Sequence, residues 1–159
     1  YIRMESNVTS IEAKEQLKSK KFGQLMRIEI TNENKKTSDD KNSNIFFELS
    51  LDDINHVIWL LDETPKVVFA ISGKISHEFD DFATILLGFE DNKSVIISLN
   101  WVTTNPKQNC NIICSTGEIS LNLLSQELTD NDQKDNALKV AEAAFLSSQK
   151  GIPIYLELK

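Results

Sequence analysis

The spacing of apolar residues along the chain predicts three helices. The first opens with a capping box, in which Thr9 is the N-cap and Glu12 reaches back to it. The second is expected to use Ser50 as its N-cap, and its apolar residues follow the i, i+3, i+4, i+7 spacing of a buried face. The third is expected to end where Gly151 can cap it. The predicted helices span residues 9–20, 50–61 and 132–150.

Shorter apolar runs, alternating or continuous, predict seven strands between and after these helices. Polar turns at 90–93 and 116–117 are short enough for hairpins, which indicates antiparallel neighbours. The order of elements therefore predicts an α+β fold, with one mostly antiparallel, open-faced sheet and the helices packed on one face. The predicted strands span residues 26–31, 66–72, 81–89, 94–101, 108–115, 118–124 and 154–158.

The sequence also predicts one disordered loop and one face of the sheet that a second copy of the chain covers. Residues 32–44 are polar throughout, contain no apolar anchor and are predicted to be a disordered loop. The apolar runs 85–87 and 95–97 are continuous instead of alternating. Both faces of the central strands are therefore expected to be covered, one by the helices and the other by a second copy of the chain.

Composition limits the classes of function. The 159 residues suit a single domain, and a net charge of −7 without a basic stripe argues against nucleic acid as a partner. No apolar run approaches the roughly 20 residues of a membrane span, and no signal peptide is visible. Cys110 and Cys114 are expected to be free core thiols, which favours a cytoplasmic location. Because the chain opens at Tyr1 without an initiator Met, we expect it to be part of a larger protein.

The sequence lacks the motifs of a self-contained active site. Its five glycines include no G-x-G-x-x-G or P-loop spacing, which a tight phosphate cradle needs. No G-x-S-x-G or H-E-x-x-H motif is present, and His56 and His77 are far apart in the sequence. We therefore predict neither a metal site nor a cofactor bound by this domain alone.

Five collinear segments carry the patterns of a known family. Residues 48–61 are similar to a helix pattern D-x-x-x-H-x-x-D-x-x-x-x-L-L, and residues 80–89 to a strand pattern D-Y-A-x-I-L-L-x-F. Residues 98–103, 115–118 and 137–154 are similar to E-V-N-W-L-T, to a G-T-E-G turn and to a closing helix with a G-x-P-V strand. Together they resemble the C-terminal domain of the Gfo/Idh/MocA oxidoreductases, in particular the UDP-N-acetylglucosamine dehydrogenase-like branch.

This resemblance implies a function for the chain as a whole. Residues 1–159 would form one C-terminal substrate and oligomerisation domain, and a separate N-terminal Rossmann domain, absent from this chain, would bind NAD or NADP. The substrate would be a sugar, a nucleotide sugar or a polyol that passes hydride to the nicotinamide. A lysine of the Rossmann domain and a histidine of the D-x-x-x-H helix would handle the proton. The partners implied are the chain's own Rossmann domain and further copies through the sheet face.

The sequence departs from the family pattern at the positions that matter for chemistry. Asp52 stands at the histidine position, and Glu48 and Asn55 stand at the two aspartate positions. Asp52 and His56, one helical turn later, are the candidate catalytic residues, and Glu48 and Asn55 are the candidate substrate-binding residues. Alternatively, Asp52 only favours the positive end of the helix, His56 is simply buried, and the chain is a non-catalytic relative that serves as a binding or dimerisation module.

Overall fold

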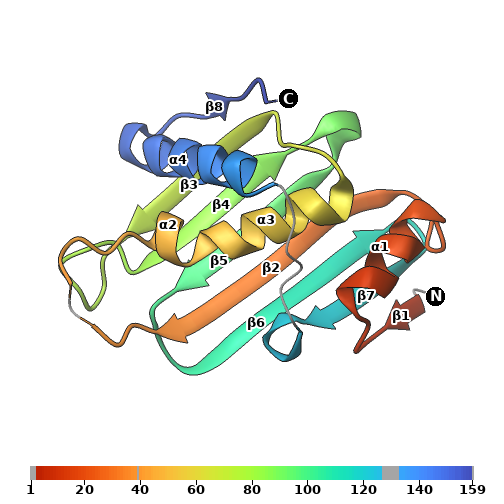
Figure 1. Cartoon of the computed structure of the whole chain (residues 1–159), viewed down its shortest axis with the longest axis horizontal. Helices are drawn as coiled ribbons and strands as arrows, with labels where there is room; N and C mark the ends of the chain where they lie inside the picture. The colour runs from red at the N-terminus through yellow and green to blue at the C-terminus, as the bar shows by residue number, and fades with distance from the viewer. Residues whose placement is uncertain (1–2, 39, 127–132, 159) are drawn as a thin grey trace.

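The computed structural model describes residues 3–38, 40–126 and 133–158 as one α+β unit (Figure 1). Eight strands form a single sheet in the order β1-β7-β6-β2-β5-β4-β3-β8. The helices cover one face of this sheet, as the sequence predicts. The strands are β1 (Arg3–Glu5), β2 (Leu25–Lys35), β3 (Val67–Gly73), β4 (Phe82–Gly88), β5 (Ser94–Asn100), β6 (Val102–Cys114), β7 (Gly117–Asn122) and β8 (Ile154–Tyr155), and the helices are α1 (Ser10–Lys18), α2 (Ile45–Glu48), α3 (Ser50–Leu61) and α4 (Lys134–Lys150).

The sheet is mostly antiparallel but mixed. Two pairs are parallel, β1 with β7 and β2 with β5, and the other neighbours run antiparallel. The long strand β2 lies at the centre, where it pairs with β5 on one side and β6 on the other. Two short 3-10 turns, η1 (Glu90–Asn92) and η2 (Leu123–Ser125), complete the described elements.

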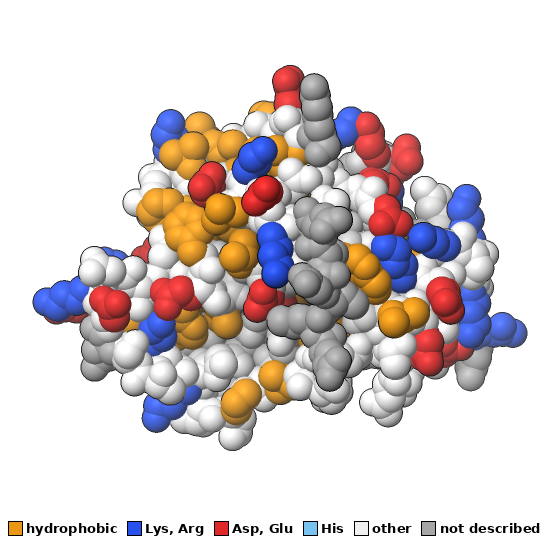
Figure 2. Space-filling model, in the orientation of Figure 1, with side chains coloured by type: hydrophobic (Ala, Val, Ile, Leu, Met, Phe, Trp, Pro, Cys, Tyr) orange, Lys and Arg blue, Asp and Glu red, His pale blue; other side chains and the backbone are white. Residues whose placement is uncertain are grey.

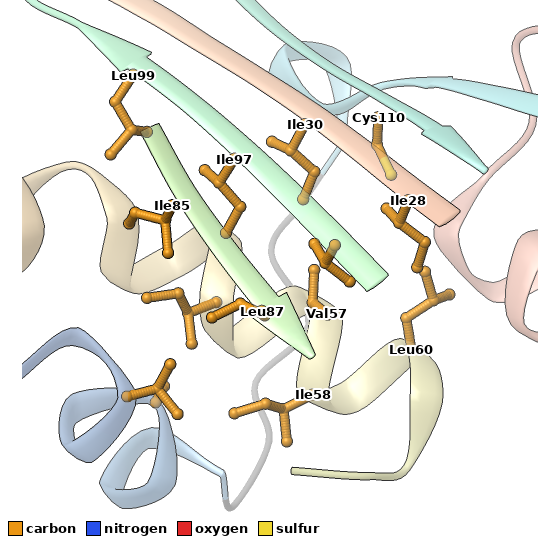
Figure 3. Close-up of a cluster of buried hydrophobic side chains, with 14 of the residues drawn as sticks. Ile28, Ile30, Val57, Ile58, Leu60, Ile85, Leu87, Ile97, Leu99 and Cys110 are labelled. Atoms are coloured by element: carbon orange, nitrogen blue, oxygen red, sulfur yellow. The ribbon is translucent and has the colours of Figure 1, made fainter. Parts of the chain in front are cut away.

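The core fills the space between the sheet and α3 and α4 (Figure 3). Burial of each large aliphatic side chain stabilises the fold by roughly 1.5–3 kcal/mol, so this layer is the main source of stability. Cys110 and Cys114 are buried free thiols, which confirms their predicted role. The labelled side chains of Figure 3 come from four strands and α3, and are Ile28, Ile30, Val57, Ile58, Leu60, Ile85, Leu87, Ile97, Leu99 and Cys110.

The second face of the sheet is not covered by any described part of the chain. Burial alternates along β4 and β5, so that Ile85 and Leu87 are buried whereas Leu86 is 43% exposed. Continuous apolar sequence therefore does not mean that both faces are covered within the chain. We call the face that carries Leu86 the open face, and its covering by a second copy stays a prediction.

The helix ends confirm two expectations and correct a third. The capping box at Thr9 and Glu12 is present, and Gly151 ends α4 in the left-handed conformation at φ 68°. Ser50 is not an N-cap, because α2 leads directly into α3 and the Ser50 hydroxyl donates to the Phe46 carbonyl. Asn44 caps α2 instead. The expected third-helix start at residue 132 lies outside the described residues.

The predicted disordered loop at 32–44 is wrong at both ends. Residues 32–35 continue β2, because both edges of that strand find partners in β5 and β6. Residues 45–48 form the short helix α2, and Asn44 belongs to its cap. The three-residue strand β1 was not predicted, β6 begins at Val102 instead of residue 108, and the final strand is only Ile154–Tyr155.

None of the helices among the described residues is both long enough and apolar enough to cross a bilayer. Hydrophobic side chains instead gather over α2 and α4 on the helical face (Figure 2). There the rings of Phe47 and Phe145 meet with centroids 5.9 Å apart.

Candidate functional site

The candidate residues meet where α2 gives way to α3. Glu48 ends α2, Leu49 breaks the helical path at φ −108° and ψ −40°, and Ser50 begins α3. We call these three residues the α2–α3 junction. Glu48 is 43% exposed, and Asp52, in the first turn of α3, is also exposed. The structure thus leaves both carboxylates accessible, one before and one after the break between α2 and α3.

Glu48 is held in place by a lysine that the sequence does not single out. The Lys36 Nζ lies 2.6 Å from the Glu48 Oε1, and the Asn44 backbone N–H donates to the Glu48 Oε2. The same Nζ lies 4.5 Å from the centre of the Trp101 ring, and the Lys36 side chain is only 14% exposed. A cation packed on a ring and against a carboxylate loses little additional freedom when it binds a ligand.

An aromatic cluster continues from Trp101 along the end of the sheet. Phe79 meets Trp101 edge-on at 5.7 Å, and the His77 ring stacks on Phe79 at 4.7 Å. The buried Asp81 carboxylate fixes this loop by accepting the backbone N–H groups of residues 75–77 and contacting the His77 ring. Burial opposes ionisation of Asp81, but the hydrogen bonds from residues 76, 77 and 75 outweigh it and lower its pKa.

Asp53 lies below the exposed pair and is completely buried. Its two carboxylate oxygens accept hydrogen bonds from the side-chain amides of Asn32 and Gln108, both at 2.7 Å. Burial raises the pKa of Asp53 to about 6, the two amides oppose the rise, and the nearby charge of Asp52 adds to it.

Asn55 and His56 differ from the exposed pair in their surroundings. Asn55 is half-buried, and its Oδ1 has no hydrogen-bond partner among the described residues. His56 is 6% exposed, packs against Trp59 with ring centroids 5.8 Å apart, and has an equally unpartnered Nε2. Burial lowers the pKa of His56 to about 4, so this imidazole is neutral at physiological pH. The four candidate residues therefore divide into accessible Glu48 and Asp52 and more enclosed Asn55 and His56.

A cavity of about 330 Å³ lies beside the α2 end of this site. Asn44, Lys41, Phe79 and Phe145 are among the residues that line it. Another cavity, of about 420 Å³, lies at the far end of α3 near Asp62 and does not include any candidate residue. We place the candidate site at the α2–α3 junction because the sequence-predicted residues Glu48 and Asp52 are accessible there and Glu48 is paired with the fixed cation of Lys36. A similar pair, Lys14 and Asp62, lies at the far end of α3 and includes no candidate residue.

The described residues do not suit a dinucleotide or a metal ion. No group of three His, Cys, Asp or Glu side chains among them could hold a metal. A phosphate cradle needs glycines that leave open space, but four of the five glycines pack against other residues, as Gly117 does against Phe22. The fifth, Gly151, is the C-cap of α4.

Sequence reasoning missed Lys36, Asn32 and the role of Asp53. Asn32 follows Ile28 and Ile30 at every second position of β2, so its side chain points to the same buried face. A polar residue at such a position indicates a buried hydrogen bond, and this signal could have been found in the sequence. Lys36 falls in the segment predicted to be disordered, and its contact with Trp101 is too distant in sequence for any local pattern to show.

The fold and the site together describe an open-faced α+β sheet domain whose helical side carries an accessible polar site. Residues 10–120 match the GFO/IDH/MocA C-terminal domain, so the chain belongs to that family. No curated protein matches the sequence.

Several solved structures share the fold. A myo-inositol dehydrogenase from Corynebacterium glutamicum superposes with a TM-score of 0.80 at 14% identity, over 96% of this chain and 62% of its own. The WlbA dehydrogenase from Bordetella pertussis, in complex with NADH and UDP-GlcNAcA, gives a TM-score of 0.76 at 14% identity, over 96% and 61%. GenD2 from gentamicin A biosynthesis, in complex with NAD, gives 0.78 at 12% identity, over 94% and 60%. The chain thus spans about three fifths of the length of these proteins.

Proposed function

We propose that this chain is the substrate-binding and oligomerisation domain of an NAD(P)-dependent oxidoreductase that acts on a sugar or a nucleotide sugar. The observation that carries the proposal is the accessible carboxylate pair Glu48 and Asp52, at the helix positions where the family pattern has its aspartate and histidine. NAD or NADP would be bound by an N-terminal Rossmann domain. Such a domain would account for the remaining two fifths of the length of the solved proteins.

The roles of the residues follow from their contacts. Asp52 is the exposed base that would accept the proton of a substrate hydroxyl. Glu48 and Lys36, already paired at 2.6 Å, would supply an acceptor and a donor to neighbouring hydroxyl groups. Asn55 would contact the substrate from the next turn of α3. His56 would act only as a neutral imidazole, because burial lowers its pKa.

Support for the substrate class comes from the neighbours in fold. WlbA was crystallised with the nucleotide sugar UDP-GlcNAcA, another neighbour is a myo-inositol dehydrogenase, and GenD2 belongs to gentamicin A biosynthesis. Of these, the nucleotide sugar agrees with the UDP-N-acetylglucosamine dehydrogenase-like patterns in the sequence. The buried free thiols Cys110 and Cys114 are compatible with a reducing compartment, and we propose a cytoplasmic location.

The open face is proposed to form the oligomer. Phe69, Leu86 and Ile96 are direct neighbours across three strands of this face. Ile71, farther along β3, is 60% exposed. A second copy on this apolar half would remove these side chains from water.

The first test is turnover by the full-length protein with NAD and with NADP, against a panel of nucleotide sugars, sugars and inositols. Removal of a general base typically costs 10²–10⁴-fold, so we expect Asp52→Asn to lower kcat/KM by at least about 100-fold. Asp135→Asn is the matched control, because Asp135 is also an exposed carboxylate in the first turn of a helix. Equal effects of the two substitutions would show that Asp52 contributes only its charge at a helix end.

The second candidate function is a non-catalytic binding or dimerisation module. It is favoured by one observation, the carboxylate of Asp52 at the family's histidine position. Intact full-length protein that binds a nucleotide sugar but shows no turnover with either cofactor would support this alternative and contradict the first.

A further inference from the structure

A buried polar cluster ties the α2–α3 junction to the centre of the sheet. Asn32 on β2 and Gln108 on β6 are direct register partners, and both turn their amides toward Asp53 on α3. The Asn32 amide also lies 3.4 Å from the Leu49 carbonyl, at the break between the helices. One cluster thus contacts two central strands, the first turn of α3 and the junction itself.

The chemistry of this cluster is unusual for a core. Among the described residues, the buried Asp53 carboxylate is hydrogen-bonded by two neutral amides and has no cation beside it. A buried charge without a cation is costly, and replacement of a whole buried polar cluster by apolar residues of similar volume is often neutral or stabilising. The carboxylate instead fixes the orientation of its neighbours, because each of its two oxygens accepts a hydrogen bond from one amide. The Asn32 amide in turn contacts the Leu49 carbonyl.

We propose that Asp53, Asn32 and Gln108 form a positioning clamp that holds the α2–α3 junction, so that Glu48 and Asp52 face the same substrate. This inference rests on the proposed function for the roles of Glu48 and Asp52. The clamp itself is defined by hydrogen bonds that exist without any ligand. Asp53 is a positioning residue, since its buried side chain does not reach the accessible surface where a substrate would bind.

The clamp depends on the ionised form of Asp53. A protonated carboxyl presents an O–H toward an amide that is itself a donor, so one of the two hydrogen bonds is lost unless that amide turns over. The titratable groups that interact electrostatically with Asp53 are Asp52, its neighbour on α3, and Cys110 from β6, and the hydrogen-bond partners from β2 and β6 are uncharged. Burial and the nearby charge of Asp53 raise the pKa of the Cys110 thiol, so this group stays neutral while Asp53 titrates.

The test follows the junction by NMR in the 159-residue chain, without substrate or cofactor. The Leu49 amide, which donates to the Ile45 carbonyl, reports whether the junction is closed. Opening of the junction alone leaves α3 packed and Asp53 buried, so that, in contrast to global unfolding, protonation weakens the closed junction without a compensating change in the burial of the carboxylate. For this local opening we expect the hydrogen-exchange protection of Leu49, corrected for intrinsic rates, to fall about fivefold from pH 7.5 to pH 5, the factor for one lost hydrogen bond. The side-chain amide signals of Asn32 and Gln108 should shift with the same midpoint, near the Asp53 pKa of about 6.

Two variants separate the clamp from general stability. Asp53→Asn should remove the pH dependence at all three positions. Asp91→Asn makes the same substitution at an exposed turn residue, whose φ is 56°, and should leave the pH dependence unchanged. If Asp53→Asn does not fold, Gln108→Ala serves instead, because loss of one donor to the charged form should move the midpoint upward.

Leu49 protection that does not change with pH in the native chain, or that still changes in Asp53→Asn, would overturn the clamp. So would an unchanged midpoint in Gln108→Ala. None of these results depends on turnover, so an inactive full-length protein would contradict the proposed function and leave the clamp standing.

Discussion

At the scale of single residues, two buried groups on α3 titrate with opposite consequences. The pKa of Asp53 is raised to about 6, so the folded chain binds more protons than the unfolded chain from about pH 4 to pH 6. Its contribution to stability therefore decreases as pH rises through that window. The pKa of His56 is lowered to about 4, so its contribution decreases as pH falls from 6.5 to 4. The two effects oppose each other across the same range.

We therefore expect substitution of either residue to reveal the pH dependence of the other. From pH 4 to pH 6 the unfolding free energy of Asp53→Asn should rise relative to the native chain, by up to about 3 kcal/mol for a two-unit shift. That of His56→Leu should fall relative to the native chain by a similar amount. Urea denaturation at pH 4, 5, 6 and 7 measures both trends. Parallel curves for all three proteins would show that neither group has a shifted pKa.

At the scale of elements, the loop between β3 and β4 depends on one side chain. Asp81 accepts three backbone N–H groups, from Ile75, Ser76 and His77, at 2.6–3.1 Å. Its own backbone carbonyl accepts the Trp101 N–H at 2.8 Å. The carboxylate thus determines where the aromatic cluster lies relative to the candidate site.

Asp81→Ala should lower the unfolding free energy by roughly 2–5 kcal/mol, because it removes three part-buried backbone hydrogen bonds to a charged carboxylate, and a hydrogen bond to a charged group is worth about 1.5–3 kcal/mol. Asp80→Ala is the neighbouring control. Asp80 accepts a single hydrogen bond from the Ser72 hydroxyl, and we expect a loss of about 1 kcal/mol. Chemical denaturation compares the two, and equal losses would mean that the backbone holds the loop without Asp81.

The same scale shows what the sequence can and cannot predict. Helix ends with local signals, such as the capping box at Thr9 and the Gly151 end, are predictable because both partners of each contact are close in sequence. Residues 32–35 are not, because their strand conformation depends on β5 and β6, some 70 residues later. The candidate site likewise contains residues that the sequence can predict and residues that it cannot. Glu48 and Asp52 follow from a helix pattern, whereas Lys36 and the Asp53 clamp require the tertiary structure.

At the scale of the whole molecule, the open face has two chemically distinct halves. Leu86 and Ile71 are exposed on the β3–β4 side, whereas Arg27 and Glu29 on β2 form an ion pair on the other side. A second copy would gain most by covering the apolar half. The charged half would then lie at or beyond the rim of the contact.

Leu86→Lys should therefore weaken self-association of the chain by at least tenfold, because it places a charge at the centre of the apolar half. Glu118→Lys is the control, on a half-buried position of β7 in the other half of the open face. Sedimentation at a series of concentrations measures the effect. A strict monomer at high concentration in the native chain would contradict the proposed interface.

The central place of β2 also affects how the protein is made. This strand is synthesised before its two neighbours, β5 and β6, which end only at Asn100 and Cys114. During translation both edges of β2 therefore stay unpaired until β5 and β6 have left the ribosome. Unpaired edges are sites of aggregation. Nascent chains truncated before Cys114 should thus depend strongly on chaperones, and the full 159-residue sequence should not.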